Sequence, residues 1–252
     1  MRHPRAILIT GASSGIGEAL AVDYAGPGIF LALGGRDRSR LEAVAAACRA
    51  KGAEVRIAAI DVADRDTTAQ WVSMIDQERP IDLLIANAGV GLEGAGNKLD
   101  EDAIRRTFAV NLDGVLNTVL PLIPAMRVRQ QGQIALMASL AGFVGLPQSA
   151  AYNASKAAVR VWGESLRLML QGDHIGVSVI CPGFVTSRLT AKNKFRMPFL
   201  MSAEKASSII RRGLARNKAR IAFPLPMKSA VWLAGVLPGG VTARLMARSA
   251  PR

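Results

Sequence analysis

The stretch Thr10-Gly11-Ala12-Ser13-Ser14-Gly15-Ile16-Gly17 decides the fold of this chain. It follows a short apolar run at residues 6–9 and precedes a segment of helical character at residues 18–25, so it predicts a strand, a glycine-rich turn and a helix start. Glycines tolerate positive φ and let backbone N–H groups approach a phosphate, while the helix N-terminus contributes roughly half a positive charge. The loop is therefore suited to a nucleotide pyrophosphate.

The spacing of the glycines is a weak signal when taken alone. The general dinucleotide fingerprint is G-x-G-x-x-G, whereas the glycines here stand at positions 11, 15 and 17. An ordinary glycine-rich turn between a strand and a helix is the competing interpretation. The order of the other elements has to decide between the two.

Four apolar runs alternate with helix-length segments in the first 90 residues, at 6–10, 29–33, 54–60 and 81–86. This alternation predicts βαβ units, and hence a parallel sheet with right-handed crossovers. Further strands are expected at 133–138, 175–181 and 221–223, and helices at 100–126, 152–170, 203–215 and 228–237. The helix at 100–126 should be substantially buried, and Pro121 or Pro124 should kink or end it. Because half of the 252 residues are apolar, we predict a single α/β domain, a Rossmann-type doubly wound parallel sheet with helices on both faces.

Cysteine and histidine usage narrows the function classes. Cys48 and Cys181 stand far apart without a Cys-x-x-Cys or Cys/His cluster, so we expect buried thiols in a reducing, cytoplasmic setting, with no disulfide and no metal site. His3 and His174 lack ligand spacing and are not expected to be catalytic. We predict neither secretion nor a membrane span, because no charged leader precedes a long apolar segment and the run at 230–237 is far shorter than the ~20 residues needed.

The net charge of +13 is unevenly distributed along the chain. From residue 188 onward there are 14 Lys and Arg residues and one acidic residue, whereas residues 1–187 contain 18 basic and 18 acidic residues. A solvated face is the default interpretation of such a charge run. Because the charges alternate with large apolar groups at 195–201 and 241–248, we also hypothesise peripheral contact with an anionic membrane. No nucleic acid is expected, since aromatic residues make up only 5% of the chain and no nucleic-acid motif interleaves with the basic residues.

A tyrosine and a lysine stand four residues apart in Tyr152-Asn153-Ala154-Ser155-Lys156, 13 residues after Ser139 closes the strand at 133–138. On a helix this pair projects from one face, toward the carboxyl ends of the strands, where open α/β sheets bind ligands. Together with the glycine loop, Val110-Asn111, Asn87-Ala88-Gly89 and the Pro-Gly-x-Val-x element at 182–186, this constellation resembles the short-chain dehydrogenase/reductase family from residue 6 to about residue 187. Beyond residue 187 the similarity is one of layout only.

The resemblance implies hydride transfer between a nicotinamide cofactor and a carbonyl or alcohol, with Asn111, Ser139, Tyr152 and Lys156 as catalytic residues. By this resemblance Tyr152 passes the proton, and Lys156 binds the ribose hydroxyls and, with the nicotinamide, lowers the pKa of Tyr152. Ser139 would hydrogen-bond the substrate oxygen, and Asn111 would hold a water of a proton relay. The implied cofactor contacts are Gly11, Ser13, Ser14, Gly15, Ile16, Gly17, Arg36, Asp61, Val62, Asn87, Ala88, Gly89, Tyr152, Lys156, Pro182, Gly183, Val185 and Thr186.

Arg36 is the residue from which we predict the preferred cofactor. It ends the second apolar run, where a Rossmann chain has either an acid for the ribose 2′-OH or an arginine for the 2′-phosphate, so NADP(H) is preferred and NAD(H) is the alternative. Ser14 weakens this preference, since NADP-dependent relatives often have a second basic residue there. Beside Arg38 and Arg40, Arg36 would otherwise belong to a solvated face.

Other positions keep a second interpretation as well. Asp61 and Val62 match a pair that contacts the adenine, but Asp61 would alternatively cap the helix beginning near Asp64. Ala86 departs from the family pattern, which has asparagine before Asn87. A mid-helix asparagine such as Asn111 more often has a local hydrogen-bonding role.

The predicted function is an NADP(H)-dependent oxidoreductase that acts on a small apolar carbonyl or alcohol. Residues 1–187 would form the cofactor-binding and catalytic core, and residues 188–252 a substrate lid and a basic C-terminal segment. The Met- and Phe-rich segment at 188–202 adapts to an apolar ligand, unless its residues simply pack on the core. The helices at 100–126 and 152–170 predict a homodimer or homotetramer. The alternatives are a catalytically weak nicotinamide-binding regulator and a membrane-surface binding protein on the same scaffold.

Overall fold

The computed structural model describes residues 3–91, 99–146, 149–192, 197–237 and 240. Its strands are β1 Ala6–Thr10, β2 Phe30–Gly35, β3 Glu54–Ala59, β4 Leu83–Ala86, β5 Gly132–Met137, β6 Ile175–Pro182 and β7 Arg220–Phe223. They form one parallel sheet in the spatial order β3-β2-β1-β4-β5-β6-β7. Every predicted strand overlaps an observed one. The prediction of a doubly wound α/β fold is confirmed, whereas the division of one domain at residue 187 stays a prediction.

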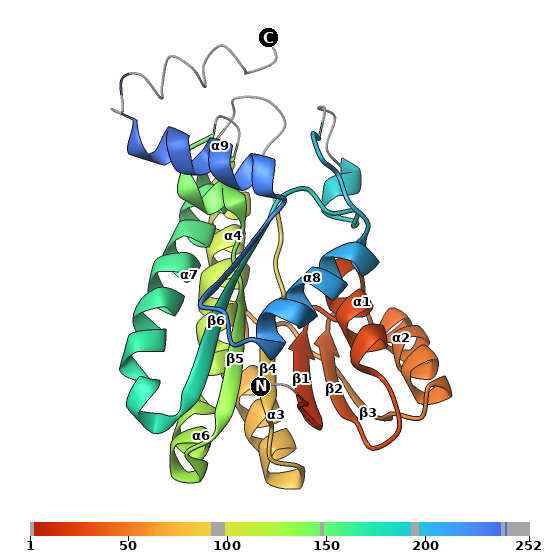
Figure 1. Ribbon diagram of the computed structural model, residues 1–252. Coiled ribbons are helices and arrows are strands. Elements are labelled where there is room, and N and C mark those ends of the chain that lie inside the picture. Colours follow the sequence, from red (N-terminus) through yellow and green to blue (C-terminus); the bar gives the residue numbers. More distant parts are fainter. Residues whose placement is uncertain (1–2, 92–98, 147–148, 193–196, 238–239, 241–252) are drawn as a thin grey trace.

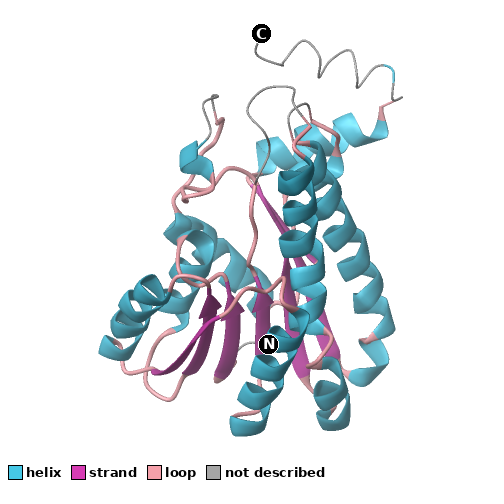
Figure 2. Cartoon of the chain, turned by 180° about the vertical axis from the view of Figure 1, so that it is seen from behind, coloured by secondary structure: helices cyan, strands magenta, loops and turns pink. Residues whose placement is uncertain are grey.

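Helices cover both faces of the sheet (Figures 1 and 2). They are α1 Gly15–Tyr24, α2 Arg38–Ala50, α3 Arg65–Glu78, α4 Glu101–Phe108, α5 Gly114–Val119, α6 Ile123–Arg129, α7 Ala150–Met169, α8 Ala203–Ala215 and α9 Leu225–Val236. Side chains of β1 alternate between two cores: Ile7 and Ile9 pack with α1, α2 and α8, while Ala6 and Leu8 pack with α3, α5, α6 and α7. The strands are therefore buried on both sides, as their continuous apolar runs indicate.

The strand order reverses between β1 and β4, which are neighbours in space. In open α/β sheets ligands bind beyond the carboxyl ends of the strands at this point. The glycine loop after β1 and Asn87 after β4 both lie there. The fold thus places the predicted cofactor segments at one edge of the sheet.

The predicted helix at 100–126 is interrupted twice. Residues Ala109–Asp113 form a π-helical turn between α4 and α5. The helix is interrupted a second time by a turn at residues 120–122, before α6 begins. Pro121 lies in that break and Pro124 in the first turn of α6, where its missing N–H costs nothing. The prediction that proline ends this helix is confirmed, but the π-helical turn was not foreseen.

The same helical run is less buried than expected. By length and composition alone Glu101–Arg129 could cross a membrane, a test that core helices of soluble proteins also pass, and 39% of its most apolar window is buried. Val115, Val119 and Met126 pack into the core, whereas Leu120 is exposed. The prediction of substantial burial is therefore met in part: the side that packs on the sheet is buried, while Leu120 is exposed.

Cys48 and Cys181 are free and buried, as predicted. Among the described residues no His, Cys, Asp or Glu cluster has the makeup of a metal site. The helix predicted at 241–248 lies outside the described residues.

Candidate active site

The glycine loop forms a tight cradle between β1 and α1. Gly11 and Gly15 have φ of +65° and +60°, in the region that favours glycine. A Cβ on Gly17 would lie 2.3 Å from the Gly11 carbonyl oxygen and 2.5 Å from Nδ2 of Asn87. Because α1 begins at Gly15, its free N–H groups and the positive end of its dipole face the loop. The loop has the geometry of a phosphate site.

Asn87 ties β4 to this loop. Its Nδ2 donates to the carbonyl oxygens of Thr10 (3.0 Å) and Gly11 (3.1 Å), and Oγ1 of Thr10 accepts from the backbone N–H groups of Asn87 (3.2 Å) and Ala88 (3.3 Å). Sequence reasoning missed the part played by Thr10, although a hydroxyl residue at a strand end before a glycine loop is a visible signal. These four bonds fix the loop relative to the centre of the sheet.

Arg36 is exposed directly after β2, at the position expected for contact with the ribose. Asp37 caps α2 by accepting from the Arg40 amide (3.1 Å), and it also pairs with Nε of Arg40 (3.1 Å). Nη1 of Arg40 is a buried nitrogen without a hydrogen-bond partner in the described structure. A buried, unpaired guanidinium nitrogen in the first turn after β2 is a donor that an anionic ligand would satisfy. Sequence reasoning had named Arg40 only as a neighbour of Arg36 and had predicted no ligand contact for it.

Asp61 does not cap α3, so the alternative interpretation of this residue is wrong. Asp64 is the cap, and its carboxylate accepts from the Thr67 amide at 3.1 Å. The Asp61 carboxylate instead forms an ion pair with Arg106 of α4 and accepts from the Ala63 amide. Partial burial acts to raise the pKa of Asp61, but the Arg106 and Ala63 hydrogen bonds, with the charges of Arg106 and Arg36, lower it below the usual value.

Val62, the neighbour of Asp61, is buried against α5. A Cβ on Gly114 would lie 2.5 Å from Cγ2 of Val62, and the Val62 carbonyl accepts from Nδ2 of Asn117 at 2.9 Å. The Asp61-Val62 segment is therefore held from α4 and α5, whose residues follow it by more than forty positions in the chain.

Ser139, Tyr152 and Lys156 converge beyond the carboxyl end of β5. Nζ of Lys156 donates to the Met137 carbonyl at 2.8 Å and lies 5.9 Å from the centre of the Tyr152 ring. A Cβ on Gly89 would be 3.3 Å from the same Nζ, which places the ammonium beside the Asn-Ala-Gly segment. The structure thus brings together three predicted catalytic residues and one predicted cofactor segment.

Burial has the largest effect on the pKa values of Tyr152 and Lys156. It raises the pKa of Tyr152, with the hydrogen bond to Ser139 acting in the opposite direction. It lowers the pKa of Lys156 to about 8, and the neighbouring Cys181 acts to raise it. The expectation of a lowered tyrosine pKa is not met in the free protein, because removal from water disfavours the phenolate more than the nearby groups favour it.

Asn111 sits at the centre of the π-helical turn and is fully buried. Its Oδ1 accepts from the Val90 amide (2.8 Å), and its Nδ2 donates to the Val90 carbonyl (2.9 Å) and to Oγ of Ser155 (3.1 Å). The side chain therefore links the segment after β4 to the catalytic helix α7. Ser155, which also donates to the Tyr152 carbonyl at 2.8 Å, is a supporting residue that sequence reasoning missed.

The segment that begins at Pro182 closes the other side of the site. Oγ of Ser139 donates to the Pro182 carbonyl at 3.4 Å, and the Gly183 amide donates to the Phe223 carbonyl at 2.7 Å. Val185 is buried and Thr186 is exposed, while a Cβ on Gly15 would lie 2.9 Å from Cβ of Ser187. The start of the predicted lid therefore lies directly against the glycine loop.

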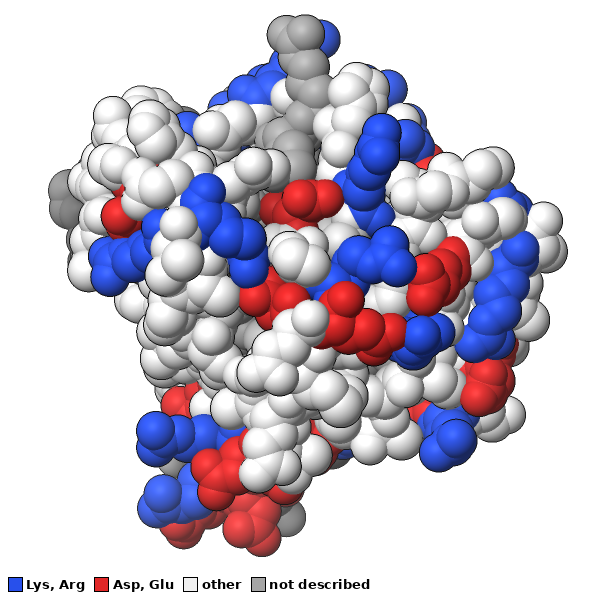
Figure 3. Space-filling model, turned by 90° about the horizontal axis from the view of Figure 1, so that it is seen from below, with Lys and Arg blue, Asp and Glu red and all other residues white. Residues whose placement is uncertain are grey.

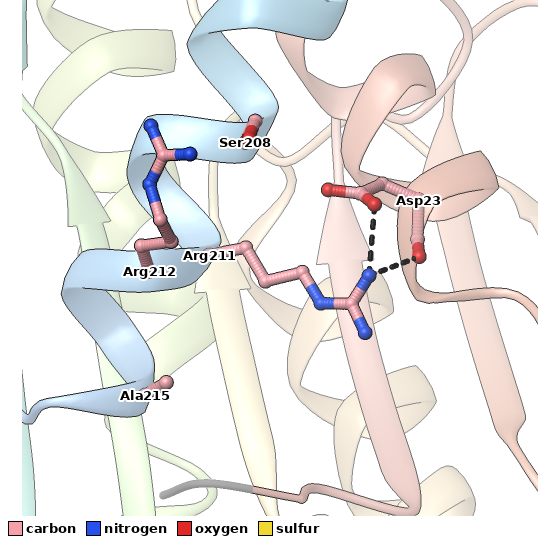
Figure 4. Close-up of a pocket in the computed structure, with 5 residues that line it drawn as sticks. All are labelled: Asp23, Ser208, Arg211, Arg212 and Ala215. Carbon is pink, nitrogen blue, oxygen red and sulfur yellow. Dashed lines mark hydrogen bonds and ion pairs between the residues drawn. The ribbon is translucent and has the colours of Figure 1, made fainter.

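A solvent-open cleft of about 310 Å³ lies elsewhere, between α1 and α8 (Figure 4). Nη1 of Arg211 crosses it to the Asp23 carboxylate at 2.8 Å, with Ser208, Arg212 and Ala215 around them. Asp23 lies near the end of α1, one helix length from the glycine loop. This cleft is separate from the candidate active site.

The fold and the site define a dinucleotide-binding α/β protein with a Ser, Tyr and Lys set at the switch point. Comparison with known proteins gives the family: short chain dehydrogenases match residues 5–197. An uncharacterized oxidoreductase of Myxococcus xanthus is 38% identical over 235 residues, which cover 93% of each chain. This chain belongs to the short-chain dehydrogenase/reductase family, whose members are oxidoreductases of small molecules.

Solved structures show the same architecture with nicotinamide cofactors bound. A short-chain dehydrogenase/reductase from Burkholderia phymatum in complex with NAD has a TM-score of 0.84 at 26% identity and covers 92% of this chain and 93% of its own. A short-chain dehydrogenase from Sphingobium yanoikuyae in complex with NADPH has a TM-score of 0.80 at 26% identity. The match covers 98% of this chain and 96% of that one. These structures support a nicotinamide cofactor for the chain.

Proposed function

We propose that this protein is an NADP(H)-dependent reductase of apolar carbonyl compounds. The observation that carries the proposal is the convergence of Ser139, Tyr152 and Lys156 beside the glycine cradle. The alternative of a catalytically weak regulator has no support, because the Ser, Tyr and Lys set is complete and assembled.

The residues of the cradle fit a dinucleotide. The close approaches at Gly11, Gly15 and Gly17 leave no room for side chains, so backbone N–H groups would meet the pyrophosphate. Arg36 and the unpaired Nη1 of Arg40 would hold a 2′-phosphate, and this supports the preference for NADP(H). Both arginines belong to the chain just after β2, where the ribose binds in this class of fold.

The chemistry requires a hydride and a proton. A bound reduced nicotinamide would supply the hydride to the carbonyl carbon. Tyr152 would give its hydroxyl proton to the carbonyl oxygen. The carbonyl group is thereby reduced to an alcohol, and Tyr152 is left as a phenolate. The raised pKa of Tyr152 keeps it protonated at neutral pH, which suits the acid needed for reduction. Ser139 would donate a hydrogen bond to the same oxygen as negative charge develops on it.

Lys156 has a supporting role in this scheme. An ammonium has three N–H donors, and one of them bonds the Met137 carbonyl. Its positive charge would stabilise the Tyr152 phenolate left after proton transfer. The segment at 183–202 supports the apolar nature of the substrate, since Leu189 lies against Gly91 and the same segment also exposes Phe199 and Leu200.

The test is turnover of a panel of apolar aldehydes and ketones, followed by the absorbance of NADPH. Tyr152→Phe should abolish turnover and leave NADPH affinity within about twofold, because only the proton-carrying oxygen is lost. Ser139→Ala should lower kcat at similar cofactor affinity. Most of the activity remaining in Tyr152→Phe would contradict the assignment, since another group or solvent would then donate the proton.

A further inference from the structure

Exposed apolar side chains gather at one end of the molecule. The carboxyl ends of the strands lead toward residues 99–100 before α4, the segment at 183–202 (described at 183–192 and 197–202) and α9. These described parts share that end of the molecule (Figure 1). Seven of the thirteen large apolar side chains found exposed in the described residues belong to them: Leu99, Leu189, Phe199, Leu200, Leu225, Trp232 and Leu233. An exposed apolar group of this extent marks an interaction surface.

Helix α9 is apolar on two opposite faces. Met227 and Val231 pack against the core, and Sδ of Met227 would be 2.9 Å from a Cβ on Gly183, at the base of the segment at 183–202. The opposite face carries Leu225 (70% exposed) and Trp232 (59% exposed), one on each of two turns. A helix that is apolar all round is normally buried in a core or a membrane. The outer face of α9 therefore lacks a partner in the described structure.

The charge of the two segments points to the chemistry of that partner. Residues 183–202 contain four Lys and Arg residues, residues 224–252 contain another four, and neither segment contains an acid. Of these cations Arg188 and Lys228 are seen to be exposed. The opposite end of the molecule instead shows acidic and basic side chains intermixed (Figure 3). The ion pairs on the amino-terminal side of the sheet include Arg127–Asp173 and Arg56–Glu78. By sequence, the excess of positive charge thus lies on the same segments as the apolar side chains.

We infer that the outer face of α9 and the segment at 183–202 dock on an anionic lipid bilayer. Apolar insertion combined with cationic side chains is the pattern of interfacial segments. A second copy of this chain fits less well, because a two-fold axis would place each all-cationic segment against its own copy.

Docking in this orientation turns the entrance of the site toward the lipid. Ser187 lies against Gly15 and Met227 against Gly183, so the docking segments directly adjoin the cofactor cradle. This part of the inference rests on the proposed function: an apolar carbonyl compound would enter from the bilayer. The binding itself does not depend on turnover and is measured separately from it.

The experiment is co-sedimentation of the full chain with vesicles of phosphatidylcholine, alone or mixed with phosphatidylglycerol, at low and at high salt. We expect binding to the anionic vesicles that weakens at high salt, since the attraction decays over a Debye length. Trp232→Ser/Leu233→Ser should abolish it. The matched control is Leu168→Ser/Met169→Ser, which removes two exposed apolar side chains from the far end of α7.

Two further measurements separate insertion from charge. Trp71 and Trp162 are buried or partly buried, so a blue shift of tryptophan emission on anionic vesicles should come from Trp232 and vanish in Trp232→Phe. Arg188→Gln/Lys228→Gln should weaken binding roughly fivefold for each charge removed. The control Arg216→Gln/Lys218→Gln, at the opposite end, should have little effect.

Four results would overturn the inference. The first two are no binding to anionic vesicles at low salt and binding to both vesicle types that is independent of salt. The third is equal loss of binding in the α7 control. The fourth is unchanged binding by Trp232→Ser/Leu233→Ser, because the outer face of α9 would then take no part in binding the vesicles. If the chain binds vesicles but reduces no carbonyl compound, the docking stands and the proposed function fails.

Discussion

Asn111→Ala should destabilise the protein by an amount that the structure sets. The substitution leaves the Val90 amide and carbonyl without the partners they have at 2.8 and 2.9 Å. An unsatisfied buried polar group costs about 1–3 kcal/mol, so two of them cost roughly 2–6 kcal/mol. Ser155 keeps its hydrogen bond to the Tyr152 carbonyl and adds little. For a chain of this size, where 1 kcal/mol shifts Tm by roughly 2–4 °C, we expect a fall of about 4–24 °C.

The assay is thermal unfolding followed by circular dichroism, with NADPH turnover measured on the same samples at low temperature. Thr118→Val is the matched control, since Thr118 is also buried in this helical run but its hydroxyl only bonds back to Gly114 within the helix. It should change Tm by a few degrees at most. A Tm of Asn111→Ala equal to that of the parent would refute the reasoning, because the Val90 groups would then be satisfied without Asn111.

Three further predictions follow from charged groups. Arg36→Ala should weaken NADPH binding by about 10- to 100-fold with little change for NADH, since a charge-assisted hydrogen bond contributes roughly 1.5–3 kcal/mol; equal affinity of the intact protein for both cofactors would contradict this. Burial lowers the pKa of Lys156 to about 8 from its usual 10.5, so the unfolded state binds more protons between these values and stability should rise with pH there. The Tm of the parent relative to that of Lys156→Met should therefore increase with pH across this range. A Tm difference that does not change with pH would refute the prediction. Arg129→Ala leaves the buried Asp76 carboxylate without bonds of 2.7 and 2.9 Å and should cost about 3 kcal/mol in urea unfolding, whereas a loss below about 1 kcal/mol would mean that Asp76 is solvated.

The elements near the glycine loop could be predicted from sequence because their signals are local. β1 and α8 have the predicted bounds, and Arg36 follows β2 as expected. The carboxyl ends of parallel strands meet at one edge of a sheet, so the order of motifs along the chain was enough to predict that they meet. This reasoning gave the fold class and the assembly of Ser139, Tyr152 and Lys156. The lid positions at 193–196 lie outside the described residues.

Contacts between distant segments were beyond the reach of local patterns. Asp61 and Arg106 are 45 residues apart, and the sequence favoured a helix cap for Asp61 as readily as a ligand contact. The π-helical turn at Asn111 also has no local signature, since the side chain bonds residues on a loop and on α7. Arg40 was named only as a neighbour of Arg36, because the burial of its Nη1 depends on how the chain around it packs.

The sequence by itself determined the α/β fold, the nucleotide loop and the identity of the residues at the site. These depend on the period of apolar residues and on glycine spacing, which are properties of short stretches. The tertiary structure alone decided the raised pKa of Tyr152, the lowered pKa of Lys156 and the apolar outer face of α9. The reason is that burial is a property of the packed molecule. Removal from water disfavours the charged form of a side chain and so shifts its pKa, and only the packing of distant segments determines whether the side chain is removed from water.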